Sequence, residues 1–143
     1  MIRFRNAFFA IAAVLFVHVI ALGMGLYASV DWFDVPMHFF GGYAIALLAL
    51  AVWNWIGDLV EIRSKTVSAN PYARLVLEGV FVVGFVMIIG VAWEWYEFLF
   101  DQFATSLVRE LGVAQPGLAD TMDDLFNDFV GGIAAWVFWR NNA

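Results

Sequence analysis

The chain has 143 residues, of which 64% are hydrophobic and only 14% charged, with a mean hydropathy of +0.82 and a net charge of −6. An ordinary soluble domain is about half apolar and about a quarter charged, so this composition argues against a soluble protein. Because the sequence contains no cysteine, disulfides, thiolate metal sites and cysteine nucleophiles are excluded. The length suits one domain, residues 1–143.

Apolar stretches cover residues 8–30, 36–56, 75–100 and 122–139. Each approaches the roughly 20 residues that a helix needs to cross the hydrocarbon core of a membrane. Helices satisfy every backbone polar group without water, so we predict an all-α, polytopic membrane protein with a bundle of four transmembrane helices. Arg3 and Arg5 before the first stretch would also suit a signal peptide. This apolar run is longer than the usual signal core of about 7–15 residues, which favours an uncleaved anchor.

The charged residues are distributed unevenly about these stretches. Six of the seven basic residues fall on one side of a bundle with an even number of helices: Arg3, Arg5, Arg63, Lys65, Arg74 and Arg140. The positive-inside bias therefore predicts that both termini are cytoplasmic. Ten of the thirteen acidic residues belong to the opposite, outer half: Asp31, Asp34, Glu94, Glu97, Asp101, Glu110, Asp120, Asp123, Asp124 and Asp128. The outer ends of the helices are thus predicted to be strongly acidic.

Three stretches bring acids to a similar depth below the outer surface. The segment "DWFDVPMHFFGG" leads into the second apolar stretch, "WEWYEF" closes the third, and "DTMDDLFNDFVGG" leads into the fourth. Spacings of three or four residues place the acids of each stretch on one helix face. We therefore expect one pocket, open to the outside, with the candidate metal ligands Asp34, His38, Glu94, Glu97, Asp124 and Asp128.

Carboxylate-rich clusters suit hard cations such as Mg²⁺, Mn²⁺ or Ca²⁺, and a single histidine also permits Zn²⁺ or Fe²⁺. A bound divalent cation would let several carboxylates stay ionised together. Without a cation, the same groups would suit a proton relay or general acid/base chemistry instead. No catalytic residue can be assigned from the sequence, and no organic cofactor is predicted.

Several polar residues have simpler explanations. Asp120 and Asp123 suit the start of a helix, where the macrodipole favours negative charge. His18 is expected to be a hydrogen-bonded core residue, and Asp31 and Asp101 are expected to face water at the rim. Glu78 is expected at the inner interface. The glycine pairs at residues 41–42 and 131–132 are predicted to let the second and fourth helices approach closely.

The order of the polar motifs resembles that of VanZ-like membrane proteins and of a related group of uncharacterised bacterial inner-membrane proteins. The VanZ-like pattern runs Asp-Lys-x-x-His-Phe, Glu-x-x-Gln and Asp-x₃-Asn-x₂-Gly, and the similarity spans residues 31–132. This chain has Val35 in place of the lysine, Glu97 in place of the glutamine and Asp128 in place of the asparagine. These departures make the site more acidic and closer to the uncharacterised relatives.

The resemblance implies a multi-pass protein of the bacterial inner membrane with an outward-facing polar site. VanZ-like proteins are associated with resistance to the glycopeptide teicoplanin, and the resemblance does not supply a reaction.

Three functions remain open. The first is an acidic pocket that binds a divalent cation and binds or acts on a lipid-linked or envelope substrate. Were it an enzyme, it would be a metal-dependent hydrolase or transferase for a phosphate-bearing lipid headgroup. The alternatives are a component of proton- or cation-coupled transport and a non-catalytic, envelope-binding accessory protein. Membrane lipid and a lipid-linked substrate are the expected partners; an oligomer is allowed, and no nucleic-acid partner is expected.

Overall fold

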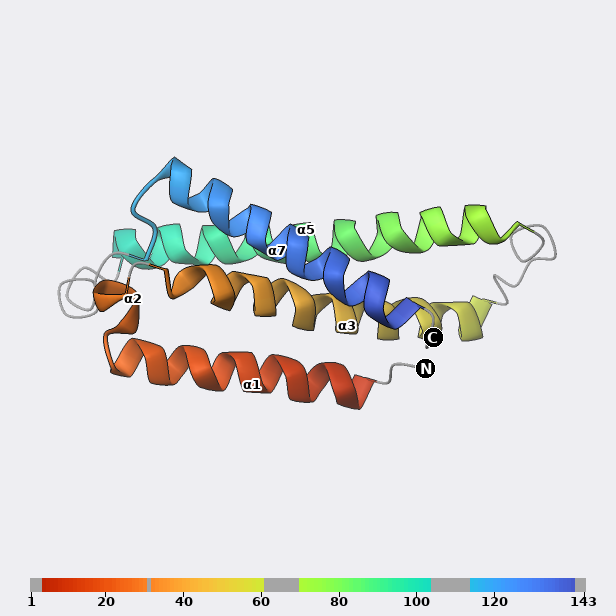
Figure 1. The fold of residues 1–143 in the computed structure, drawn as a ribbon, viewed down its shortest axis with the longest axis horizontal. Coiled ribbons are helices and arrows are strands. Elements are labelled where there is room, and N and C mark those ends of the chain that lie inside the picture. Colours follow the sequence, from red (N-terminus) through yellow and green to blue (C-terminus); the bar gives the residue numbers. More distant parts are fainter. Residues whose placement is uncertain (1–3, 31, 61–69, 104–113, 141–143) are drawn as a thin grey trace.

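The computed structural model describes residues 4–30, 32–60, 70–103 and 114–140, apart from the side chains of residues 58–60. Within these ranges the chain is helical and contains no strand. The elements are α1 (Phe4–Gly23), the short α2 (Leu26–Ser29), α3 (Asp34–Val60), α5 (Pro71–Phe103) and α7 (Leu118–Trp139), arranged as one elongated bundle (Figure 1). The all-α prediction is confirmed.

Three segments are long and apolar enough to cross a membrane, namely Phe4–Gly23, Asp34–Gly57 and Pro71–Phe103. The helix α7 is not among them, because Asp120, Asp123, Asp124 and Asp128 lie in its first half. The outside of the bundle is rich in exposed apolar side chains, among them Phe16, Val80 and Ile88. Such a surface is unusual for a soluble monomer and suits contact with lipid.

The start of the chain differs from the single helix predicted over residues 8–30. The helix α1 ends at Gly23, and Gly25 adopts a left-handed conformation with φ of 65°. Glycine tolerates this conformation because it has no Cβ atom, so the chain turns there before the four residues of α2. The prediction of one continuous helix to residue 30 was therefore wrong at its C-terminal end.

The helix α5 begins with a conventional cap. The side-chain Oδ1 atom of Asn70 accepts hydrogen bonds from the backbone N–H groups of Tyr72 (3.1 Å) and Ala73 (3.2 Å). Pro71 occupies the first helical position, where its missing N–H group costs nothing. The helix thus starts four residues before the predicted apolar stretch and runs for 33 residues, or about 50 Å.

The central helix is α3, which contacts α1, α5 and α7, and its contact with α7 is the most extensive. Glycines make this contact possible. A Cβ atom added to Gly42 would overlap the backbone of Asp128, and one added to Gly131 would overlap the carbonyl oxygen of Phe39. The predicted close approach of these two helices at their glycine pairs is confirmed.

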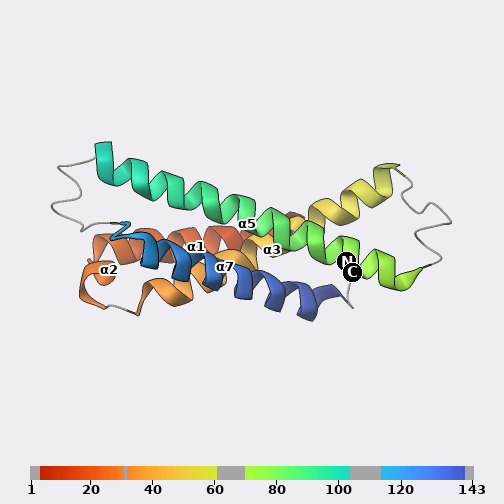
Figure 2. The ribbon, with the colours of Figure 1, turned by 90° about the horizontal axis from the view of Figure 1, so that it is seen from above.

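The direction of the helices gathers the acidic segments at one end. The start of α3, the end of α5 and the start of α7 lie together, whereas the start of α1 and the end of α7 lie toward the opposite end (Figures 1 and 2). Between the two ends is an apolar core that includes Leu50, Val82 and Val86. The fold therefore separates a polar end from an apolar middle.

Candidate functional site

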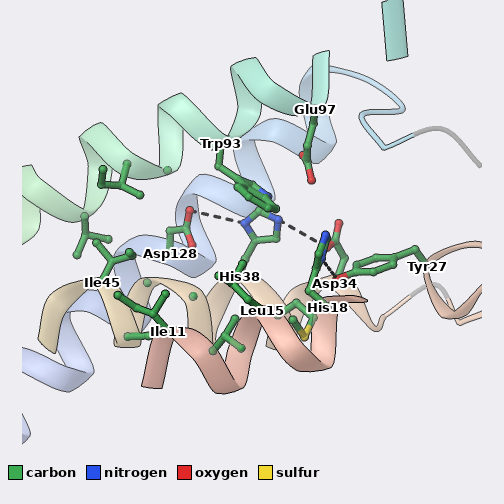
Figure 3. Close-up of a pocket in the computed structure, with 18 residues that line it drawn as sticks. Ile11, Leu15, His18, Tyr27, Asp34, His38, Ile45, Trp93, Glu97 and Asp128 are labelled. Carbon is green, nitrogen blue, oxygen red and sulfur yellow. Dashed lines mark hydrogen bonds and ion pairs between the residues drawn. The ribbon is translucent and has the colours of Figure 1, made fainter. Parts of the chain in front are cut away.

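The imidazole of His38 lies between carboxylates on two sides. Its Nε2 atom is 3.6 Å from Oδ1 of Asp34, one turn earlier on α3, and 3.7 Å from Oδ1 of Asp124 on α7. Its Nδ1 atom is 3.6 Å from Oδ2 of Asp128, also on α7 (Figure 3). These separations are longer than direct hydrogen bonds, so the three carboxylates surround the imidazole ring without forming short hydrogen bonds to it.

Two groups of side chains have ligand atoms close enough to share an ion. In the first, atoms of His38, Glu94, Glu97 and Asp124 all lie within 4.8 Å of one another, and all four residues are buried. In the second, atoms of Asp34, Asp120 and Asp124 meet the same limit. Asp124 belongs to both groups. The structure thus brings five of the six predicted ligands, together with Asp120, into one polar cluster.

Several oxygen atoms of this cluster are buried without a hydrogen-bond partner among the described residues: Oε1 of Glu94, Oε2 of Glu97, Oδ2 of Asp120 and Oδ2 of Asp124. As whole residues, Glu94, Glu97 and Asp124 are only 3%, 8% and 3% exposed. Within the described ranges, no lysine or arginine forms an ion pair with them. Buried polar atoms normally have a hydrogen-bond partner. A bound ligand could take the place of the missing partner for these oxygens.

Asp128 differs from the other predicted ligands, since it belongs to neither of the two groups. Its carboxylate occupies space that two glycines leave open. A Cβ atom added to Gly90 on α5 would lie 2.6 Å from Oδ2 of Asp128, and one added to Gly41 would lie 3.7 Å from Oδ1. From this position Asp128 faces Nδ1 of His38, while Nε2 of His38 faces the carboxylates of Asp34 and Asp124. A carboxylate on the far ring nitrogen typically orients a metal-binding histidine.

Gln115, which the sequence analysis did not single out, and Asp101 also contribute to the site. The Nε2 atom of Gln115 donates hydrogen bonds to Oε2 of Glu94 (3.3 Å) and Oγ1 of Thr121 (2.9 Å). Asp101 holds this segment in place, because its carboxylate accepts from the backbone N–H groups of Ala114 (3.0 Å) and Gln115 (2.8 Å). Asp101 is half-buried, so the expectation that it faces water at the rim omitted this structural role. No local sequence pattern indicates that the amide of Gln115 reaches Glu94, 21 residues earlier.

A cavity of about 270 Å³ adjoins the cluster between α1, α3 and α5. Most of its lining is apolar, including Leu15, Ile45, Val86 and Ile89, whereas Asp34, His38 and Glu97 contribute polar groups, as does Asp128 (Figure 3). The ring of Trp93 also lines the cavity and packs edge-on against His18, with centroids 5.4 Å apart. The cavity thus combines an apolar interior with access to the carboxylates.

His18 and Tyr27 form part of the wall of this cavity. The hydroxyl group of Tyr27 and Nδ1 of His18 form a hydrogen bond of 2.7 Å. Burial, with the nearby charges of Asp34 and Glu97, raises the pKa of the Tyr27 hydroxyl, so this group stays protonated and can donate. His18 is thus hydrogen-bonded as predicted, but it is half-buried in the wall of the cavity rather than part of the buried core.

The remaining acids are more dispersed. Asp123 is exposed, as expected for an acid at the start of a helix, whereas Asp120 joins the second group. Glu78 is buried and accepts a hydrogen bond from Nε1 of Trp136 at 3.1 Å, so it is enclosed by the bundle. Asp31 and Glu110 lie outside the described residues.

Apolar helices of membrane-spanning length and an apolar outer surface define a multi-pass membrane protein. The chain matches the family described as "Predicted membrane protein (DUF2238)" over residues 2–142 and belongs to that family. Comparisons with curated proteins and with solved structures found no match. Membership agrees with the expected relation to an uncharacterised membrane protein family, while the relation to VanZ-like proteins stays a prediction.

Proposed function

We propose that this protein holds a divalent cation in the cluster around His38 and binds or acts on a lipid-linked or envelope substrate there. In this proposal α7 forms a fourth membrane crossing, both termini are cytoplasmic, and the cluster opens to the outer side of a bacterial inner membrane. The observation that carries the proposal is the first group, in which ligand atoms of His38, Glu94, Glu97 and Asp124 lie within 4.8 Å of one another.

The energetics of burial support a cation. Ionised carboxylates inside a membrane protein are expensive and are usually paired, hydrated or functional. Ligand oxygens that lie about 2.0–2.6 Å from an ion are at most roughly 4–5 Å apart, which matches the spacing of this group. The donor set of one imidazole and several carboxylates suits Mg²⁺, Mn²⁺, Ca²⁺ or Zn²⁺. A bound cation would be coordinated by the oxygens of Glu94, Glu97 and Asp124 that lack a hydrogen-bond partner among the described residues.

The adjoining cavity supports a substrate with an apolar chain. Leu15, Ile45 and Ile89 suit contact with methylene groups, while Glu97 links the cavity to the carboxylate cluster. A chain in the cavity would therefore bring its headgroup to the cation. A cation neutralises phosphate charge and can activate water, so hydrolysis or transfer at a phosphate-bearing headgroup is the chemistry that this arrangement favours.

Thermal unfolding of the purified protein in detergent tests the cation site. We expect Mn²⁺, Mg²⁺, Ca²⁺ or Zn²⁺ to raise the unfolding temperature of the wild-type protein, because a ligand that binds only the folded state stabilises it. Glu97→Gln and Asp124→Asn should remove this response while keeping side-chain size. Asp123→Asn is the matched control, since Asp123 is exposed on the same helix as Asp124. An unchanged metal response in both cluster variants would refute the site.

Release of inorganic phosphate from a phosphate-bearing lipid in mixed micelles tests the reaction. Turnover that requires the metal and is lost in Glu97→Gln would support an enzyme. Metal binding without turnover would instead favour an envelope-binding accessory protein, whose cluster holds the outer ends of the helices together.

Transport is the other candidate, and the apolar core weighs against it. A proton or cation leaving the cluster would have to pass Leu50, Val82 and Val86, which are fully or almost fully buried. Glu78 lies beyond them but is already bonded to Trp136. Reconstituted vesicles distinguish the two ideas: pH- or cation-driven flux that depends on Glu97 would favour transport.

A further inference from the structure

We infer that the cluster is a two-cation centre in which the Asp124 carboxylate is shared by both ions. This inference rests on the proposed function, since it specifies the metal content of the same site. Its basis is that two groups of ligand-bearing side chains, each compact enough for one ion, have Asp124 in common. His38, Glu94 and Glu97 complete one group, and Asp34 and Asp120 complete the other.

The two oxygens of Asp124 are suited to this role. Oδ1 lies 3.7 Å from Nε2 of His38, and Oδ2 is buried without a partner among the described residues. Oδ2 of Asp120 is a second buried oxygen without a partner, in the group that lacks histidine. One ion in the histidine group would leave that oxygen unused. Each group thus has its own unsatisfied acceptor in addition to the shared residue.

The charge of the cluster also favours two ions. The groups contain the five carboxylates of Asp34, Glu94, Glu97, Asp120 and Asp124. If all are ionised and His38 is neutral, their total charge is −5, which one divalent cation would reduce to −3 and two would reduce to −1. Excess like charge in a buried site is costly, so the second ion relieves much of the remaining repulsion.

The cavity meets both groups. Glu97 belongs to the histidine group and Asp34 to the other, and both side chains line the cavity. In two-metal sites, the ions lie about 3.5–4 Å apart and together hold the oxygens of a phosphate group. A phosphate-bearing headgroup that enters from the cavity would therefore contact both ions. This assigns a phosphate ester or anhydride as the substrate class.

Mn²⁺ titration of the purified full-length protein, followed by electron paramagnetic resonance and elemental analysis, tests the inference. The wild-type protein should bind two Mn²⁺ per chain and show the magnetic coupling of neighbouring ions. Asp120→Asn and Glu94→Gln should each bind one Mn²⁺, with the spectrum of an isolated ion. Asp124→Asn should bind at least 10-fold more weakly at both positions, and Asp123→Asn should bind two ions as the wild type does.

The outcomes separate this inference from the proposed function. One Mn²⁺ per wild-type chain, unaffected by Asp120→Asn, would overturn the two-cation centre and leave a single-cation site. Two ions without magnetic coupling, or two ions retained in Asp124→Asn, would overturn the shared carboxylate. No binding of Mn²⁺, Mg²⁺, Ca²⁺ or Zn²⁺ by the wild-type protein would overturn both proposals. The wild-type measurement decides even where a variant fails to fold.

Discussion

Asp128 lies 3.6 Å from Nδ1 of His38, on the opposite side of the ring from the carboxylates that face Nε2. In the proposed cation site, this placement would suit Asp128 to orient His38 rather than to bind the ion directly. Asp128→Asn should therefore lower the affinity for a divalent cation by about 10–100-fold without abolishing binding. Calorimetric titration with Mn²⁺ measures the effect, with Asp123→Asn as the control. Wild-type affinity in Asp128→Asn would contradict this role.

The contact between α3 and α7 depends on the missing side chain of Gly42. A Cβ atom there would overlap the Asp128 backbone, which cannot move as a flexible side chain can. Gly42→Ala should therefore push the helices apart and destabilise the protein by about 1–3 kcal/mol. Gly84→Ala is the control, since Gly84 is exposed and a Cβ atom there meets nothing within 4 Å. Thermal unfolding in detergent gives the comparison, and equal unfolding temperatures would contradict the close contact.

The buried Glu78 and the half-buried Trp136 form a hydrogen bond between α5 and α7. Trp136→Phe removes the donor and leaves the Glu78 carboxyl group without this partner, which should cost about 1–3 kcal/mol of stability. Adding Glu78→Leu to that variant should recover part of the loss, because an apolar pair leaves no polar group unsatisfied. Chemical denaturation followed by circular dichroism measures the free energy of unfolding.

Trp55→Phe is the control for this prediction, since the Trp55 side chain is 52% exposed and its loss should have little effect. If the double variant is less stable than Trp136→Phe alone, the hydrogen bond is not the source of the loss.

The absence of cysteine allows the orientation to be tested by single-cysteine labelling without background. Leu118 and Tyr72 are both highly exposed, at the starts of α7 and α5. With cytoplasmic termini, a membrane-impermeant thiol reagent should label Leu118→Cys in intact cells, and Tyr72→Cys only after the cells are opened. Labelling of both residues in intact cells would mean that α5 and α7 do not connect opposite sides as proposed. The reverse pattern would invert the orientation.

Much of the fold follows from the sequence because each helix is encoded locally. Long apolar runs specify helices that need no partner for their backbone hydrogen bonds, so the element type and approximate length of α3, α5 and α7 were predictable. The four-residue spacing of Asp120, Asp124 and Asp128 likewise places them on one face of α7. The turn at Gly25 was missed because two glycines in an apolar run do not by themselves end a helix.

The roles of the individual acids depend on how the helices cross. Helical spacing alone does not indicate which acid meets which neighbour, since that is decided by the close contact at Gly42 and Gly131. This contact places Asp128 on one side of His38 and Asp124 on the other. Gln115 bonds Glu94 from a segment whose backbone N–H groups are bonded to Asp101, which lies elsewhere in the chain. Composition and periodicity therefore determined that this is an apolar helical bundle with one acidic end. Tertiary packing decided which carboxylates meet, because the distances between helices are set by contacts between residues that are far apart in the sequence.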